Sequence, residues 1–272
     1  MMTSGTNAAR FVLFLFLTVL GTGCATTSSL QAHDLSRYGA NSDATYRIDV
    51  AGGHGSGVVV SAEGHILTCH HVIENEASVS VTIDEGGPYP HVYQARVIAD
   101  DPADDLAILK VDRRFRTPAV IGDLSEVRPG DRLYNIGYPY DFGEMTGRGY
   151  VMRLHFSADE GRLPIRDMIL ADIPDGPGTS GSGVYLESNG RLIGIMRMMI
   201  AVGRRGAPPM VVRGLVPVNR IRAFLEANRI PYLRSDGETA TYPPSPPAPP
   251  PAPRPSPSPA HSAKPAHAPA KH

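Results

Sequence analysis

Three segments, far apart in the sequence, carry side chains that could act together in nucleophilic catalysis. His71 follows an apolar segment at residues 65–68, Asp105 precedes the apolar run 106–109, and Ser180 lies among glycines. A serine hydroxyl is a weak nucleophile at neutral pH and needs a base to accept its proton. An imidazole can be that base, and an aspartate can hold the ring in the correct tautomer. The three residue types therefore indicate Ser-His-Asp chemistry.

The glycines around Ser180 could prepare the backbone for the same reaction. Gly178 and Gly181 permit a tight turn that residues with a Cβ rarely adopt. The N–H groups of Gly178 and Ser180 could then point at one oxyanion, and each such donor stabilises a transition state by about 3 kcal/mol. The simpler alternative is a flexible surface turn, so the segment alone does not decide between the two.

A cluster of cysteine and histidine suggests metal binding as a competing interpretation. Cysteine and histidine are common zinc ligands. The cluster consists of His54, His65, Cys69, His70 and His71. Adjacent residues on a strand point to opposite faces, so neighbouring members would not converge on one ion. We therefore expect no metal site and no cofactor.

The elements that must position these residues read as short strands. Runs of β-formers alternate with glycine-rich turns, and we expect strands at 57–61, 65–68, 79–83, 95–98, 106–109, 132–136 and 191–195. This pattern predicts an all-β barrel or sandwich. One segment, residues 218–229, has apolar side chains at helical spacing and lies between Pro217 and Pro231, so it predicts a helix.

Four blocks in this order resemble the trypsin-fold serine proteases, most closely the bacterial HtrA/Deg group. They are GSGVVVSAEGHILTCHHVI (55–73), DPADDLAILKVD (101–112), IGDLSEVRPGDRLYNIGYP (121–139) and DGPGTSGSGVYLESNGRLIGI (175–195). The resemblance implies two antiparallel six-stranded β-barrels, an active site between them and a C-terminal helix. The protease domain is expected to span residues 43–235.

The resemblance also chooses between neighbouring candidates for each role. The base in this family immediately precedes a valine, which selects His71 over His70. The aspartate stands directly before Leu-Ala, which selects Asp105 over Asp104. Ser180 is the implied nucleophile. The second hydroxyl of the loop, on Ser182, is interpreted as a small packing residue, and Cys69 as a buried apolar one.

Substrate preference is predicted from the positions that form the specificity pocket in this family. The base of the pocket lies six residues before the nucleophile, at Pro174. The wall is expected from residues 195–199, that is Ile195, Met196, Arg197, Met198 and Met199. A proline base with a largely apolar wall predicts a small or medium apolar residue before the cleaved bond.

The N-terminal segment predicts export. Arg10 precedes a ten-residue apolar run at residues 11–20, followed by small residues, so residues 1–24 are typical of an export signal. Cys24 resembles the lipidation site of bacterial lipoproteins; the alternative is ordinary cleavage after Ala25. We expect residues 25–42 to be a linker and the protein to lie at the periplasmic face of a bacterial membrane, or to be secreted.

The C-terminal segment, residues 236–272, is predicted to be a disordered tail. Thirteen of its last 30 residues are proline, a composition that cannot bury a core and favours polyproline II. A tether is the simpler interpretation, and contact with the cell wall is the alternative. His261, His267 and His272 are too loosely spaced to predict a metal site. HtrA proteases usually continue into PDZ domains, which support their large assemblies. This sequence continues instead into the proline-rich segment, so it does not predict an oligomeric state.

The charge balance argues against nucleic acid as a partner. The chain has 26 Lys and Arg against 27 Asp and Glu, whereas nucleic-acid binding usually requires a basic face. We therefore expect a serine endopeptidase acting on proteins or peptides of the cell envelope. The alternative is a catalytically inactive peptide-binding or scaffold lipoprotein on the same fold; the intact set of three residues favours the enzyme.

Overall fold

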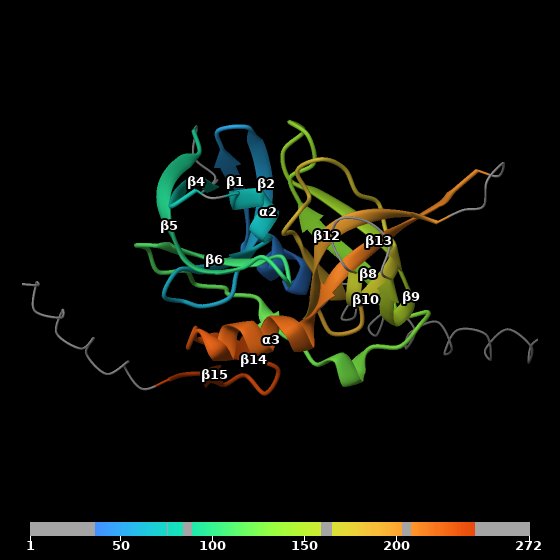
Figure 1. Cartoon of the computed structure of the whole chain (residues 1–272). Coiled ribbons are helices and arrows are strands. Elements are labelled where there is room, and N and C mark those ends of the chain that lie inside the picture. Colours follow the sequence, from blue (N-terminus) through green and yellow to red (C-terminus); the bar gives the residue numbers. More distant parts are fainter. Residues whose placement is uncertain (1–35, 75, 84–88, 159–164, 203–207, 243–272) are drawn as a thin grey trace, which may run out of the picture. The chain divides into compact units, whose positions relative to one another are not determined.

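A computed structural model describes residues 36–74, 76–83, 89–158, 165–202 and 208–242. The predicted export signal with Cys24, and most of the predicted tail, lie outside the described residues. The described part is dominated by antiparallel strands (Figure 1). No helix within it is long and apolar enough to cross a lipid bilayer.

The first barrel contains six antiparallel strands. They are β1 (Thr45–Val50), β2 (Gly53–Val59), β3 (His65–Thr68), β4 (Ser78–Ile83), β5 (His91–Asp101) and β6 (Leu106–Val111). Pairing runs in the order β1-β2-β3-β6-β5-β4, and β1 closes the barrel against β4. In β4 every second side chain is buried, as the alternating sequence predicts. The strands expected at residues 57–61 and 65–68 overlap β2 and β3, which form a hairpin in which Val58 pairs with Leu67.

The second barrel also closes from six antiparallel strands. They are β8 (Arg132–Gly137), β9 (Met145–Ala158), β10 (Ile165–Asp172), β11 (Gly183–Leu186), β12 (Leu192–Val202) and β13 (Met210–Pro217). The pairing of β11 with both β8 and β12 closes the ring. The short strands β7 (Val120–Ile121), β14 (Tyr232–Arg234) and β15 (Thr239–Ala240) extend one edge beyond β12. The predicted fold is therefore confirmed.

Two helical turns lie between strands of the barrels, and one longer helix follows the last barrel strand. A single turn, α2 (His70–Ile73), follows β3, and a 3₁₀ turn, η1 (Leu124–Glu126), precedes β8. The helix α3 (Val218–Ala227) begins after Pro217 and ends two residues before the predicted boundary. Its buried face joins a core cluster that also contains Ile108 of β6 and Val216 of β13. The helix therefore shares a core cluster with residues of both barrels, and it lies below them in Figure 1.

The chain on either side of the predicted protease domain is also structured. Residues 36–42, which were expected to be part of a linker, are helical. The Asn41 side chain donates hydrogen bonds to the Tyr134 hydroxyl and the Gly190 carbonyl, both at 2.8 Å. At the other end, β14 pairs with β15, so the described sheet continues to Ala240 rather than ending at residue 235. Long-range hydrogen bonds of this kind leave no periodic signal in the sequence.

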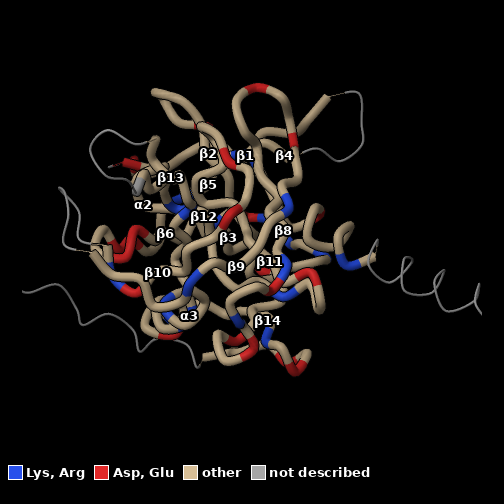
Figure 2. The backbone as a smooth tube through the Cα atoms, turned by 90° about the vertical axis from the view of Figure 1, so that its right-hand side faces the viewer, with Lys and Arg blue, Asp and Glu red and all other residues tan. Residues whose placement is uncertain are grey.

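Both signs of charge are spread over the described residues. Figure 2 shows acidic and basic positions interleaved along both barrels. This distribution agrees with the near-neutral balance of the sequence.

Candidate active site

The first barrel supplies His71 and Asp105 as a hydrogen-bonded pair. His71 lies in α2, directly after β3, and Asp105 lies directly before β6. The Asp105 backbone is left-handed, with φ 57°, a conformation that aspartate tolerates better than most residues. The His71 Nδ1 lies 2.8 Å from Asp105 Oδ2, and the His71 backbone N–H donates to Oδ1 at 2.9 Å. Two separate bonds therefore fix the carboxylate against the turn that holds the imidazole.

The charge state of Asp105 decides which ring nitrogen carries the proton. Burial raises the pKa of the Asp105 carboxyl, but hydrogen bonds from His71 and the charges of His71 and Arg197 outweigh burial and hold that pKa below its ordinary value. An ionised carboxylate only accepts hydrogen bonds, so Nδ1 of His71 must be the donor. In the neutral ring, Nε2 is then left as a proton acceptor.

The lowered pKa of Asp105 predicts how stability depends on pH. Because the folded pKa lies below the unfolded value, the carboxylate stabilises the fold above about pH 4, the ordinary aspartate range, and this contribution is lost as pH falls through the folded pKa. We expect the free energy of urea unfolding to fall more steeply below about pH 4 in the native protein than in Asp105→Asn. Parallel curves for the two proteins would contradict this prediction.

The second barrel supplies Ser180 from the turn between β10 and β11. The Ser180 carbonyl accepts from the Ser56 N–H of β2 at 2.8 Å, and the Gly181 N–H donates to the Met196 carbonyl of β12 at 2.8 Å. Gly181 has φ 84°, and a Cβ there would lie 2.2 Å from the Ser56 carbonyl oxygen. Glycine is therefore required for the nucleophile turn to approach β2 so closely.

The backbone before Ser180 is held in one orientation by two hydrogen bonds. The Pro177 carbonyl accepts from the Tyr140 N–H at 2.6 Å, and the Gly178 carbonyl accepts from the Ser56 hydroxyl at 2.7 Å. Because a trans peptide is planar, the Gly178 N–H points away from the Pro177 carbonyl and its Tyr140 partner. Ser56 and Tyr140 have no role in the sequence prediction, because their contacts link segments distant in the chain.

The N–H groups of Gly178 and Ser180 differ from those of their neighbours. Thr179, Gly181 and Ser182 each donate a backbone hydrogen bond within the loop or to β12. Within the described part of the chain, no hydrogen bond is donated by the Gly178 or Ser180 N–H. Two donors close together are thus left available for an acceptor from outside the protein.

Substitution of Gly178 tests whether this backbone shape matters. Gly178 has φ 101°, and a Cβ would lie 2.3 Å from the Tyr138 carbonyl oxygen and 2.4 Å from His54 Nε2. We expect Gly178→Ala to displace the loop and lower kcat at least about 10²-fold, the usual effect of losing one oxyanion donor. The control is Gly130→Ala, where φ is 93° but no atom lies within 4 Å of the added Cβ. Equal activity of the two variants in a peptidase assay would count against the prediction.

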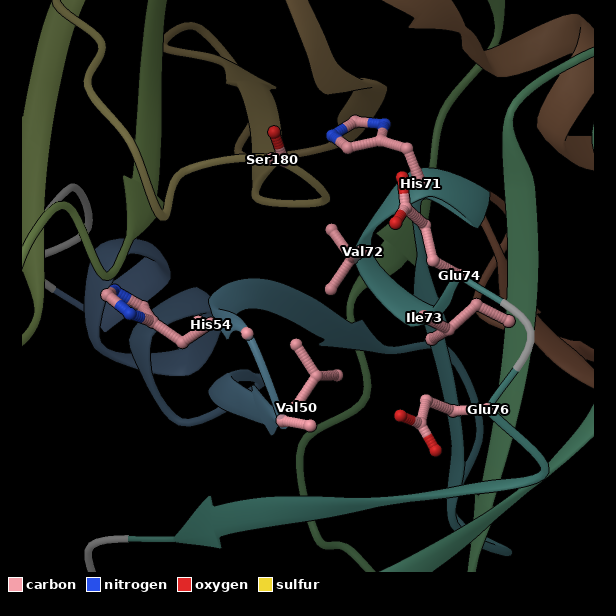
Figure 3. Close-up of a pocket in the computed structure, with 11 residues that line it drawn as sticks. Val50, His54, His71, Val72, Ile73, Glu74, Glu76 and Ser180 are labelled. Atoms are coloured by element: carbon pink, nitrogen blue, oxygen red, sulfur yellow. The ribbon is translucent and has the colours of Figure 1, made fainter.

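His71 and Ser180 line one end of the same cavity. It encloses about 330 Å³ and is formed by Val50, Ala51, Gly52, Gly53, His54, His71, Val72, Ile73, Glu74, Glu76 and Ser180. Figure 3 shows a ring nitrogen of His71 directed toward the Ser180 hydroxyl. No hydrogen bond joins these two side chains in the described structure. Such bonds are often long before substrate binds.

The residues predicted to form the specificity pocket are not brought together. Ile195 and Met196 belong to the two hydrophobic cores, with at most 1% of their surface exposed. Arg197 is 4% exposed and donates from Nε to Asp105 Oδ2 at 3.1 Å. Pro174 is exposed and lines a separate cavity that includes Tyr140. Ile195, Met196 and Arg197 line neither this cavity nor the one that His71 and Ser180 share.

The histidines of the alternative metal cluster point to different partners. His54 bonds to the Tyr138 carbonyl, His65 to the Ser61 hydroxyl and His70 to Asp100. Among the described residues, only one group of three or more possible ligands has its ligand atoms within 4.8 Å of one another, namely Cys69, His71 and Asp105.

The thiol of that set is poorly suited to bind a metal. Burial raises the pKa of Cys69 well above its ordinary value. The protonated thiol donates to the Met196 carbonyl at 3.2 Å. Because metal ligation requires the thiolate, this set is disfavoured as a metal site.

The competing residues of each catalytic position have other contacts. Asp104 forms an ion pair with Arg220 of α3, whose Nε donates to Oδ2 at 2.8 Å. The Ser182 hydroxyl is fully buried and has no hydrogen-bond partner in the described structure. Within the described structure, neither side chain forms a hydrogen bond with His71 or Asp105.

Comparison with known proteins agrees with this geometry. Residues 55–195 match the family described as "Trypsin-like peptidase domain". This match covers more than half of the chain, so the chain belongs to the trypsin-like peptidase family. The resemblance to the HtrA/Deg group is likewise confirmed by the relatives below.

Several HtrA/Deg proteins are similar to part of this chain. Protease Do-like 1 of Arabidopsis thaliana is 33% identical over 54% of this chain and 34% of its own length. The periplasmic pH-dependent serine endoprotease DegQ of Escherichia coli is 32% identical over 56% and 32%. Serine endoprotease DegS of Haemophilus influenzae is 29% identical over 54% and 42%. The chain thus spans less than half the length of these relatives.

Solved structures show the same fold. A crystal structure of Deg5 superposes with a TM-score of 0.58 and 24% identity, covering 71% of this chain and 92% of that chain. The HtrA-type protease AlgW with tripeptide gives a TM-score of 0.59 at 24% identity, covering 72% and 63%. At this identity the likeness supports the two-barrel architecture alone.

Proposed function

We propose that this protein is a serine endopeptidase that uses Ser180, His71 and Asp105 as a catalytic triad. The observation that carries the proposal is the hydrogen-bonded His71–Asp105 pair at one end of a cavity that Ser180 also lines. The N–H groups of Gly178 and Ser180 form the proposed oxyanion hole. Family membership and the names of the serine endoprotease relatives agree with this activity.

In the proposed reaction, Nε2 of His71 accepts the Ser180 proton while Oγ attacks the peptide carbonyl carbon. The carbonyl π electrons move onto oxygen, and the two free N–H groups stabilise the oxyanion. Asp105 stabilises the imidazolium that forms. The C–N bond then breaks, and His71 returns the proton to the leaving amine. His71 then takes a proton from water as the water oxygen attacks the acyl-enzyme carbonyl carbon. The bond to Ser180 Oγ breaks, and His71 returns the proton to Oγ.

The two sides of the cleaved bond meet different surfaces. Because His71 must reach the leaving amine, we propose that the cavity of Figure 3 receives the chain that follows the bond. Before the bond, a small or medium apolar residue is proposed. Two charged residues that could influence this preference, Asp175 and Arg197, already have partners. Arg197 pairs with Asp105, and Asp175 lies 3.2 Å from Nε of Arg213. Neither charge is then free to select a charged substrate.

Cell-envelope proteins are the proposed substrates. Several relatives are named as periplasmic serine endoproteases, and the N-terminal segment is typical of export. Membrane attachment through lipidated Cys24 is part of the proposal, with the proline-rich tail as a spacer that could contact the cell wall. Mass spectrometry of the mature N-terminus tests the anchor: a diacylated cysteine at position 24 supports it, and an unmodified N-terminus at residue 26 contradicts it.

A fluorophosphonate probe tests the activity on the full chain. This reagent forms a covalent bond with activated serines, so it requires the nucleophile and its base together. We expect one label, located at Ser180 by peptide mass spectrometry, and none in Ser180→Ala. Well-folded native protein that takes no label would favour the alternative, an inactive peptide-binding or scaffold protein.

A further inference from the structure

Arg197 occupies an irregular position in β12 that turns its side chain toward the candidate active site. Met196 pairs with Leu215 of β13, whereas Met198 pairs with the preceding residue of that strand, Gly214. Arg197 is therefore the extra residue of a β-bulge. Bulges bend a strand locally and redirect a side chain, and they occur often beside active sites.

The guanidinium of Arg197 is buried against the carboxylate of Asp105. Their side chains are 3% and 8% exposed, and Nε of Arg197 lies 3.1 Å from Oδ2 of Asp105. The same oxygen lies 2.8 Å from His71 Nδ1. A buried guanidinium needs an opposite charge close by. Oδ2 of Asp105 is therefore shared between the imidazole of His71 and a permanent cation.

The adjoining residue ties this bulge to the other parts of the site. The Met196 carbonyl accepts from the Gly181 N–H of the nucleophile loop at 2.8 Å. It also accepts from the Cys69 thiol, at the start of α2, at 3.2 Å. The position of Arg197 is thus fixed relative to both Ser180 and His71, so the contact with Asp105 is a feature of the packed site rather than of a free side chain.

We propose that Arg197 is a positioning residue that holds the Asp105 carboxylate and extends the activity of the enzyme to lower pH. This inference rests on the proposed function. In the resting site, Arg197 and Asp105 neutralise each other, whereas proton transfer from Ser180 makes the ring of His71 a second cation. Repulsion between two nearby cations disfavours the protonated ring. Arg197 therefore offsets part of the attraction between Asp105 and the protonated ring, the form of His71 that cannot act as a base.

The other charged and titratable groups around the pair do not replace this effect. From α2, the Cys69 thiol stays protonated because burial raises its pKa, and Glu74 ends the turn in the cavity. From β2, His54 lines the same cavity. Asp104, beside Asp105, is paired with Arg220 of α3. All of these groups remain unchanged when only residue 197 is replaced.

The test is the pH profile of kcat/KM for the full chain with Arg197→Gln, together with the rate of fluorophosphonate labelling. We expect the midpoint of the acid limb to move upward by roughly one pH unit in both measurements, as expected for removing one nearby charge. KM should stay unchanged because Arg197 does not line the cavity. Arg197→Lys keeps the charge and should restore the native midpoint. Arg220→Gln, which removes an equivalent ion pair at Asp104, is the matched control and should leave the profile unchanged.

The outcomes separate this inference from the proposed function. Native protein that is never labelled at any pH would contradict the endopeptidase itself. Native protein that labels, with an unchanged or downward-shifted midpoint in Arg197→Gln, would overturn the role of Arg197 and leave the endopeptidase intact. If Arg197→Gln does not fold, Arg197→Met carries the same prediction, because it fills the buried site with an uncharged side chain of similar length.

Discussion

Replacing Ser180 with alanine is expected to lower kcat for peptide hydrolysis by about 10⁶-fold and leave the fold intact. The hydroxyl is the atom that bonds to substrate in the proposed mechanism, and no other group in the loop can take its place. Its removal costs no hydrogen bond within the described structure, because only the backbone of Ser180 is bonded there. Thermal unfolding should therefore match the native protein while hydrolysis of a peptide substrate disappears.

The neighbouring serine provides the matched control. Ser182 lies two residues away with a fully buried hydroxyl that has no partner in the described structure. We expect Ser182→Ala to keep near-native activity, and its stability should be equal or greater because a buried unpaired hydroxyl is destabilising. If Ser182→Ala were inactive and Ser180→Ala active, the assignment of the nucleophile would be wrong.

Replacing Asp105 with asparagine is expected to lower kcat by about 10⁴-fold. The amide keeps the size of the carboxylate, but it can donate a hydrogen bond to the ring of His71. The ring can then present an N–H instead of a lone pair to Ser180, and it loses the charge that stabilises the imidazolium. Labelling of Ser180 by the fluorophosphonate should slow in parallel, since both reactions need the same base.

The buried ion pair between Asp105 and Arg197 means that Asp105→Asn should affect stability as well as catalysis. A neutral asparagine side chain would leave the buried charge of Arg197 without its partner, so we expect Asp105→Asn to lower the melting temperature as well. The double variant Asp105→Asn with Arg197→Gln should recover part of that stability without recovering activity. Stability and catalysis can thereby be measured separately.

The adjacent carboxylate serves as the control for Asp105. Asp104 pairs with Arg220 on α3 and makes no contact with His71 in the described structure. We expect Asp104→Asn to change kcat less than about threefold, because its ion pair is partly exposed and includes none of the proposed catalytic residues. A loss of about 10⁴-fold in Asp104→Asn, with near-normal turnover in Asp105→Asn, would exchange the two roles.

The prediction of the strands from sequence depended on local patterns that need no tertiary information. Val79, Val81 and Ile83 alternate with polar residues, and the structure buries these three in β4. The continuous apolar run at residues 106–109 predicted β6, and apolar side chains at helical spacing predicted the helix after Pro217. The end of that helix was placed two residues too far, because apolar spacing does not mark where the last turn gives way to the left-handed residue Arg229.

Contacts between distant segments could not be predicted in the same way. Residues 36–42 were assigned to a linker because nothing local in them indicates a packed helix. Their anchors, such as the bond from Asn41 to Tyr134, depend on a partner far along the chain. The bonds that orient the backbone at Gly178, from Ser56 and Tyr140, have the same character. A hydrogen bond across the two barrels exists only once both have closed.

The sequence by itself predicted seven of the barrel strands, the family and the three candidate catalytic residues, because each depends on residue types and spacings within short stretches. Only the tertiary structure decided what Arg197 contacts. Its position in the sequence predicted that Arg197 belongs to the wall of a substrate pocket. The register shift between β12 and β13 instead directs the Arg197 side chain toward Asp105. A one-residue bulge changes the direction of a side chain, and its presence depends on how two strands pair rather than on the residues of either strand alone.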